Sequence, residues 1–239
     1  MRLAALESHY FSSSKLRIEE EHATPFIMQF MKNKFLPQVF NEQLPDLTTK
    51  QQFFFSNQNT GQNILFHDNK VSFIQNFNVD KIVNEQNITY DHKNFLQFIT
   101  TMIQSHNEIR PDIKFNRISY VIKFFDLDSF DKENTSIIEH FNNFSWTKKG
   151  KKPVEFNLTF AYQDAVDSEQ INILTKTSLG GVHLIKDNHA TTADCYLKEI
   201  DVNTIDEHRI DRFNANDSLS ILNSLKTIAN EKMFQLSFN

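Results

Sequence analysis

The sequence predicts an α+β fold made of two similar sub-domains, each an antiparallel sheet with helices packed on one face. Three observations support this prediction. Residues 113–128 alternate in the manner of a strand, residues 51–79 hold apolar runs separated by tight turns, and residues 91–106 carry an apolar stripe at helical spacing. Gaps of turn length favour antiparallel neighbours, because parallel strands need long crossover connections. We expect an N-terminal sub-domain over 1–128 and a C-terminal one over 129–239.

The stretch 113–128 reads IKFNRISYVIKFFDLD and is the longest apolar run with a period of two. Phe115 and Val121 fall on one face, and Ile118, Ile122 and Phe124 fall on the other. Since both faces are partly apolar, this pattern predicts a central strand that is covered on both sides.

The N-terminal segment predicts one strand and one helix. The strand is expected over 8–20, with Leu16 and Ile18 facing inward. Thr24 and Pro25 are typical of an N-cap and a first helical residue. The apolar stripe expected on this helix is Phe26, Ile27, Phe30, Met31 and Phe35.

A meander and an amphipathic helix follow. Strands are expected over 51–57, 63–66 and 71–79, with turns at Asn59-Thr60-Gly61 and at His67 to Lys70, because Asn, Asp and Gly tolerate the backbone of tight hairpins. The helix over 91–106 is predicted by its apolar residues at i, i+3, i+4, i+7 and i+8, namely Phe95, Phe98, Ile99, Met102 and Ile103.

The second half repeats this scheme. It predicts a helix over 134–144, strands over 153–162, 170–177, 181–185 and 191–202, and a final helix over 217–234. Residues 63–70 and 182–189 each place Asp-Asn between basic residues after an apolar strand. This similarity is consistent with an internal duplication, but the favoured interpretation is that Asp-Asn is simply a good turn, since short turn motifs recur easily.

Composition narrows the class of protein. The 239-residue chain holds only four Gly and five Pro, too few for a Gly-rich phosphate loop, and its net charge of −5 argues against a dedicated nucleic-acid binder. Cys195 is the only cysteine, so one chain forms no disulfide and no cysteine zinc cluster. We expect a cytoplasmic protein with no membrane association, since the sequence shows neither a signal peptide nor a transmembrane run.

No motif with established chemistry is present in the sequence. The nine histidines include no His-Glu-x-x-His, and Asp126-x-Asp128-x-x-Asp131 lacks the glycine and glutamate of a calcium loop. Cys195 lies in a strand-like run and is expected to be a buried small hydrophobe, and Gly180-Gly181 is expected to form a bend or bulge before a strand. We therefore predict no catalytic residue, no metal and no cofactor.

Two stretches of the sequence contain candidate binding residues, a lysine-rich loop and a run of three phenylalanines. A loop with Lys148, Lys149, Lys151 and Lys152 beside Trp146 suits phosphates and a stacked base, although a solvated loop between a helix and a strand is the favoured interpretation. Phe53, Phe54 and Phe55 are consecutive, so alternation sends Phe54 to the opposite face of the sheet and predicts an aromatic patch there. That patch suggests a homodimer, or a protein partner on the 51–79 meander, unless helix 91–106 covers it.

The segments in order resemble a sporadically distributed family of bacterial proteins found in genomic islands. The likeness rests on the meander, on the strand Asn116-Arg117-Ile118-Ser119-Tyr120-Val121-Ile122 and on Tyr196-Leu197-Lys198-Glu199-Ile200-Asp201-Val202 before the last helix. The chain departs from the family at Ser119, where a glycine is usual, and in lacking a Pro-rich start. The resemblance implies a mobile-island or phage-defence setting and no particular activity. Residues 6–20 also resemble the first strand of SecB-type export chaperones.

Together these observations predict a non-catalytic binding protein, an adaptor or sensor of a mobile-island, phage-defence or toxin-control system. Three alternatives stay open. They are a metal-dependent nuclease or hydrolase assembled from scattered Asp, Glu and His, a nucleic-acid-binding module that uses the Lys148–Lys152 loop, and a SecB-like chaperone.

Overall fold

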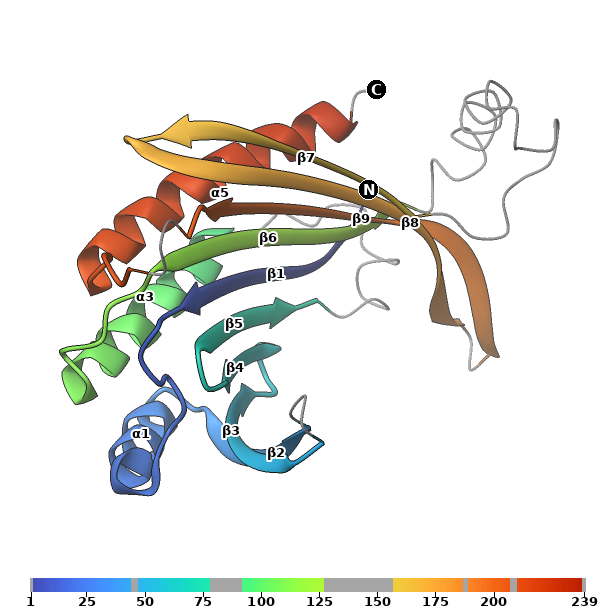
Figure 1. Cartoon of the computed structure of the whole chain (residues 1–239). Helices are drawn as coiled ribbons and strands as arrows, with labels where there is room; N and C mark the ends of the chain where they lie inside the picture. Colours follow the sequence, from blue (N-terminus) through green and yellow to red (C-terminus); the bar gives the residue numbers. More distant parts are fainter. Residues whose placement is uncertain are drawn as a thin grey trace, which may run out of the picture.

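The computed structural model describes residues 2–43, 47–77, 92–126, 157–186, 189–206 and 210–237. Its described strands form one antiparallel nine-stranded sheet, in the order β2-β3-β4-β5-β1-β6-β9-β8-β7 (Figure 1). The N-terminal elements are β1 (Arg2–Phe11), α1 (Glu20–Lys32), β2 (Leu36–Gln43), β3 (Thr49–Asn57), β4 (Gln62–Phe66), β5 (Lys70–Asn76) and α3 (His92–Ile109). The later elements are β6 (Arg117–Asp126), β7 (Asn157–Val166), β8 (Glu169–Lys186), β9 (His189–Thr204) and α5 (Ala215–Ser237).

The middle of the sheet is the antiparallel pair β1 and β6, which places Glu7 opposite Val121 and His9 opposite Ser119. β1 pairs on its other side with β5, the last strand of the first meander, and β6 pairs with β9 in the same way. The other strands of each half of the chain therefore lie on one side of the central β1–β6 pair. The α+β class is confirmed, with strands of both halves in one continuous sheet, and the division into two sub-domains stays a prediction.

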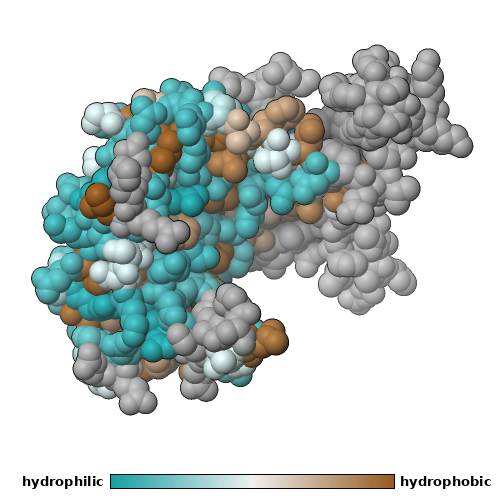
Figure 2. Space-filling view, viewed as in Figure 1, coloured by the Kyte–Doolittle hydropathy of each residue, from teal (hydrophilic) through white to brown (hydrophobic). Residues whose placement is uncertain are grey.

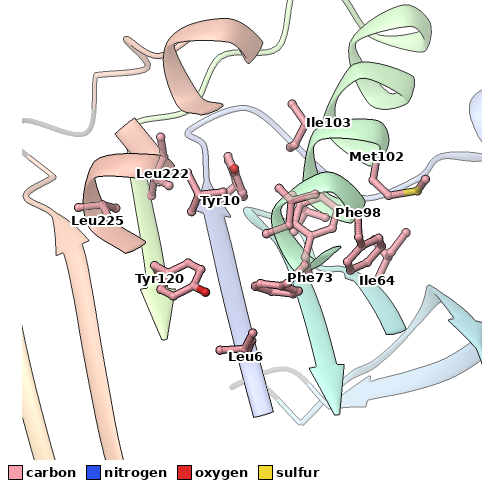
Figure 3. Close-up of a cluster of buried hydrophobic side chains, with 14 of the residues drawn as sticks. Leu6, Tyr10, Ile64, Phe73, Phe98, Met102, Ile103, Tyr120, Leu222 and Leu225 are labelled. Atoms are coloured by element: carbon pink, nitrogen blue, oxygen red, sulfur yellow. The ribbon is translucent and has the colours of Figure 1, made fainter. Parts of the chain in front are cut away.

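The helices pack on one face of this sheet. α5 lies against β6 and β9, and α3 contacts both α1 and α5. Strand alternation points Leu6, Tyr10, Phe73 and Tyr120 toward these helices, where all four are buried (Figure 3). Met102 and Ile103 from α3 and Leu222 and Leu225 from α5 fill the same core. Its apolar burial is the main stabilising term of the fold.

The first strand and first helix begin earlier than expected. The structure has β1 at Arg2–Phe11 and α1 from Glu20, so the strand predicted over 8–20 and the helix start at Thr24 are wrong. Leu16 and Ile18 are buried, but they lie in the connection between the two elements. Acidic residues at the start of α1 favour its earlier beginning, because they oppose the positive end of the helix dipole.

The meander and the two long helices agree with the sequence prediction. β3, β4 and β5 pair in order, and α3 buries all five residues of the predicted stripe. The final helix buries Leu222, Leu225, Ala229 and Met233. The helix predicted over 134–144 and the acidic residues Asp128 and Asp131 lie outside the described residues.

The C-terminal strands are longer and fewer than predicted. β8 runs through residues 170–177 and 181–185, which the sequence assigns to two strands, so Gly180 forms no bend. A Cβ on Gly180 would lie 2.5 Å from Leu197 Cδ1, so a larger residue at this position would require the Leu197 side chain to shift. β6 is a central strand as predicted, and residues on both of its faces are buried: Ile118, Tyr120 and Ile122 on the helix side, and Ser119, Val121 and Phe125 on the other.

Candidate functional site

Charged and polar side chains gather on the face of the sheet opposite α3 and α5. We call this surface the polar face and define it by residues that strand alternation places there from five strands. They are Glu7, His9, Ser72, Arg117, Ser119, Lys123, Asn172, Lys176, Glu199, Asp201 and Asn203. Seen from this side, the described surface is mostly hydrophilic, with apolar patches between (Figure 2).

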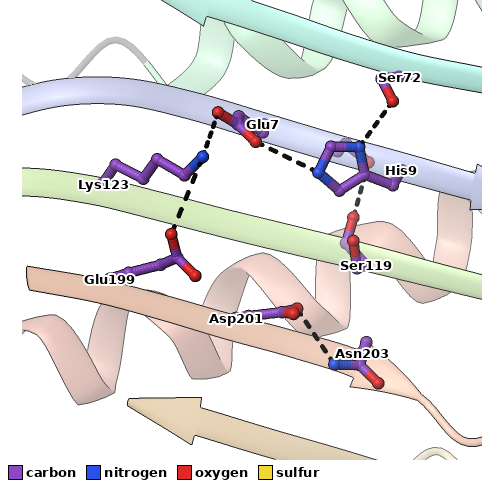
Figure 4. Close-up of polar contacts among 9 residues, drawn as sticks. Glu7, His9, Ser72, Ser119, Lys123, Glu199, Asp201 and Asn203 are labelled. Carbon is purple, nitrogen blue, oxygen red and sulfur yellow. Dashed lines mark hydrogen bonds and ion pairs between the residues drawn. The ribbon is translucent and has the colours of Figure 1, made fainter. Parts of the chain in front are cut away.

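Glu7 lies at the centre of the polar face and holds two partners (Figure 4). Its Oε1 is 2.7 Å from Lys123 Nζ, and its Oε2 is 3.2 Å from His9 Nε2. Burial alone would raise the pKa of Glu7, but the hydrogen bonds and charges of His9 and Lys123 outweigh it and lower the pKa to about 2. Glu7 is therefore a fixed negative charge in the middle of the sheet.

Lys123 connects Glu7 to the next strand. Its Nζ also lies 3.8 Å from Glu199 Oε2 on β9. The register places Lys176 of β8 directly opposite Glu199, so charges alternate in sign along this row of the sheet. Alternating charges give no extended positive field, which phosphate backbones require.

The next row of the polar face carries amides beside a buried carboxyl. Asn203 donates to Asp201 Oδ1 at 3.1 Å, Asn172 donates to Asn203 Oδ1 at 3.4 Å, and Gln163 donates to Asn172 Oδ1 at 3.4 Å. Burial raises the pKa of Asp201, against the lowering effects of Asn203, Arg117 and His9. This row offers neutral donors and acceptors of the kind that recognise peptide groups.

His9 links the charged row to a hydroxyl. Its Nδ1 lies 2.9 Å from Ser72 Oγ, while its Nε2 faces Glu7. Carboxylate, imidazole and hydroxyl thus stand in the order used for nucleophilic acyl transfer. Ser72, however, is 3% exposed within β5, so a substrate would have to reach a hydroxyl set into the sheet.

Ser119 lies in register between His9 and Asn203. Its hydroxyl is buried and has no hydrogen-bond partner among the described residues. An unpaired buried hydroxyl costs free energy, so Ser119 is a destabilising feature of this part of the sheet.

The residues that the sequence predicts as binding sites are not among those that define the polar face. Phe55 is fully buried and Phe53 packs against the core, so their rings belong to the fold, while Phe54 lies on the opposite face and is partly exposed. Trp146, Lys148, Lys149, Lys151 and Lys152 lie outside the described residues. Cys195 is buried, as predicted.

Sequence reasoning missed the polar face. Its signal is the alternation Glu7-x-His9 on the first strand and Glu199-x-Asp201-x-Asn203 on the ninth. Polar residues at every second position of otherwise apolar strands indicate one uncovered or ligand-facing surface. Within the described ranges, no group of three or more His, Cys, Asp and Glu is placed to hold a metal ion.

Comparison with known proteins finds no match to this chain among family models or among curated proteins. No helix in the described part of the chain is long and apolar enough to cross a membrane.

Two substitutions on the polar face are expected to shift stability in opposite directions. Glu7→Gln should lower the free energy of unfolding by about 1.5–3 kcal/mol at neutral pH, because it removes charged hydrogen bonds. The contribution of ionised Glu7 to the free energy of unfolding is present above pH 4.5 and is lost as the pH falls toward 2.

The control is Asp201→Asn, which keeps an oxygen that accepts from Asn203. Since burial raises the pKa of Asp201, ionising it opposes folding at neutral pH, and the variant should be as stable as wild type or more stable. Urea denaturation between pH 3 and pH 7 measures both, and a Glu7→Gln variant of wild-type stability would contradict the assignment of Glu7.

Proposed function

We propose that the chain is a non-catalytic binding protein, an adaptor or sensor of a bacterial mobile-island, phage-defence or toxin-control system, and that it acts in the cytoplasm. The polar face is its binding surface in this proposal. The observation that supports this proposal is a pre-ordered row of charges on three neighbouring strands. In this row Lys123 forms ion pairs with both Glu7 and Glu199. Side chains fixed in this way lose little entropy when a ligand arrives.

A protein ligand is favoured over a nucleic acid. Charges of both signs alternate along the polar face, and the partly exposed amides of Asn172 and Gln163 lie beside them and present donors and acceptors together. Such a surface complements a polypeptide that carries its own mixed charges. The nucleic-acid alternative depends on the Lys148–Lys152 loop, and the predicted partner site on the 51–79 meander now depends on Phe54.

The test compares two exposed lysines. Lys176→Glu changes a charge on the polar face, whereas Lys114→Glu changes an exposed charge just before β6. We expect partners co-purified from the source organism to bind the Lys114→Glu variant as they bind wild type. Binding to the Lys176→Glu variant should fall by tenfold or more, because the new carboxylate faces Glu199. Titration of the recovered partner by calorimetry measures this difference.

A hydrolase is the second candidate, because Glu7, His9 and Ser72 stand in relay order. We expect no hydrolysis of an ester probe such as p-nitrophenyl acetate above the rate with denatured protein. Hydrolysis that disappears in Ser72→Ala and persists in Ser56→Ala, a second buried serine of the same sheet, would replace the binding proposal by the enzymatic one.

A further inference from the structure

Among the strands that the structure describes, β7 forms an edge of the sheet, with β8 as its one neighbour. It pairs with β8 on one side, and residues 157–165 are all exposed. Its sequence, NLTFAYQDAV, contains no proline and a single charge, Asp164. Edge strands of this length normally carry prolines or several charges, because free backbone groups pair with any other available strand.

The other edge is different. β2 carries Pro37, which removes a backbone donor, and it contacts α1. The two edges thus differ in backbone protection, although both bear exposed apolar side chains, Leu36 and Val39 on β2 and Phe160 on β7. Phe160 is 60% exposed, with Leu158 and Tyr162 beside it on the same face.

The turn fixes which backbone groups of β7 point outward. Asp167 and Ser168 both have positive φ and connect the closing pair Val166 and Glu169, as in a two-residue hairpin. A closing pair of this kind exchanges hydrogen bonds, so even-numbered residues of β7 bond to β8 and odd-numbered ones point away. Ala165 agrees, because its N–H donates to the Asp164 carboxylate.

We propose that β7 pairs with β7 of a second copy, antiparallel, about a two-fold axis at Phe160. This register places Phe160 opposite Phe160 and Leu158 opposite Tyr162, so that apolar side chains meet. It places Thr159 opposite Ala161 with their free backbone groups facing each other, and it keeps the two Asp164 carboxylates at opposite ends. A register centred on Ala161 would instead set Leu158 against Asp164.

The occupant is a second copy because the pattern is self-complementary, and two-fold pairing requires the same surface on both partners. The axis runs perpendicular to the sheet, since each side chain meets one on its own face. The two sheets therefore join into one, with both polar faces on the same side. This interface does not depend on the proposed function, and it gives the predicted homodimer a different location from the 51–79 meander.

Light scattering on the full chain tests the pairing. We expect wild type at twice the 28.1 kDa chain mass and Phe160→Lys at the monomer mass, because the axis would bring two lysines together. Val39→Lys is the matched control, since Val39 is 53% exposed on the other edge, and it should stay dimeric. Monomeric wild type, or a Phe160→Lys variant that remains dimeric, would overturn the proposal.

Crosslinking tests the register. A cysteine at position 160 lies opposite its copy in a pair without backbone hydrogen bonds, where side chains are closest. Oxidation of Phe160→Cys should give a covalent dimer that thiol reductant reverses, and Val39→Cys should give none. The native Cys195 is buried and does not interfere. A dimer that forms with no crosslink at 160 would refute the axis at Phe160.

Discussion

Replacing Phe30 by alanine is expected to lower the free energy of unfolding by about 3–5 kcal/mol. Phe30 is fully buried between α1 and the outer strands of the first meander. Its ring centroid lies 4.8 Å from that of Phe55, 5.6 Å from that of Phe26 and 6.0 Å from that of Phe66. Alanine leaves a cavity among these rings and removes edge-to-face contacts in addition to the buried area.

The control for this substitution is the next residue. Met31 is 50% exposed, although the sequence predicts it within the same apolar stripe. Met31→Ala should change stability by no more than about 0.5 kcal/mol, because it creates no cavity. Urea denaturation of both variants measures the difference. Equal losses would mean that α1 does not pack against the sheet through Phe30.

Local patterns predicted the elements that depend on neighbouring residues. The 51–79 meander follows from Gly61, which has a φ of 72° in its turn, and from Asp68 and Asn69 in the next turn. The stripe of α3 follows from spacing alone, and all of its predicted residues are buried. Such signals lie within one helix or one hairpin, so the sequence displays them directly.

The order of the strands could not be predicted in this way. β1 lies in the middle of the sheet because it pairs with β5 and β6, whose residues are far away in the chain. The polar face has the same origin, since Glu7 and Lys123 are 116 positions apart and His9 and Ser72 are 63 apart. Contacts between residues so far apart in the chain produce only a weak sequence pattern, here the alternation of polar residues on β1 and β9.

Strand pairing also explains how the two proposals fit together. A sheet that continues through β7 into a second copy doubles the polar face without changing any residue of it. A partner that contacts both copies would then bind more tightly through effective concentration. Phe160→Lys would consequently weaken the binding of such a partner while leaving Glu7, Lys123 and Glu199 in place.

Acid is expected to destabilise the protein through His106, well above the pH at which Glu7 protonates. His106 is 4% exposed on α3, stacked on Phe66 at 6.1 Å, and its Nε2 has no hydrogen-bond partner among the described residues. Burial and the charge of Arg110 lower its pKa from 6.5 to about 3. Between these two values the unfolded chain binds a proton at His106 that the folded chain does not.

Stability should therefore decrease as the pH falls from 6.5 toward 3, by up to about 1.4 kcal/mol per pH unit from this group. Between pH 6.5 and pH 5 the loss amounts to about 1.6 kcal/mol. His106→Phe keeps an aromatic ring beside Phe66 and removes the titration, so it should abolish most of this slope. His22→Phe, at the start of α1, is the control, and this variant should keep the wild-type dependence of stability on pH.

Urea denaturation at intervals of half a pH unit separates these outcomes. Above pH 5 Glu7 stays ionised in both the folded and the unfolded chain, so its own contribution does not enter the comparison. A wild-type slope that survives in His106→Phe would show that another group binds the proton. Loss of the slope together with unchanged stability at pH 7.5 would establish His106 as a neutral core residue whose protonation accompanies unfolding.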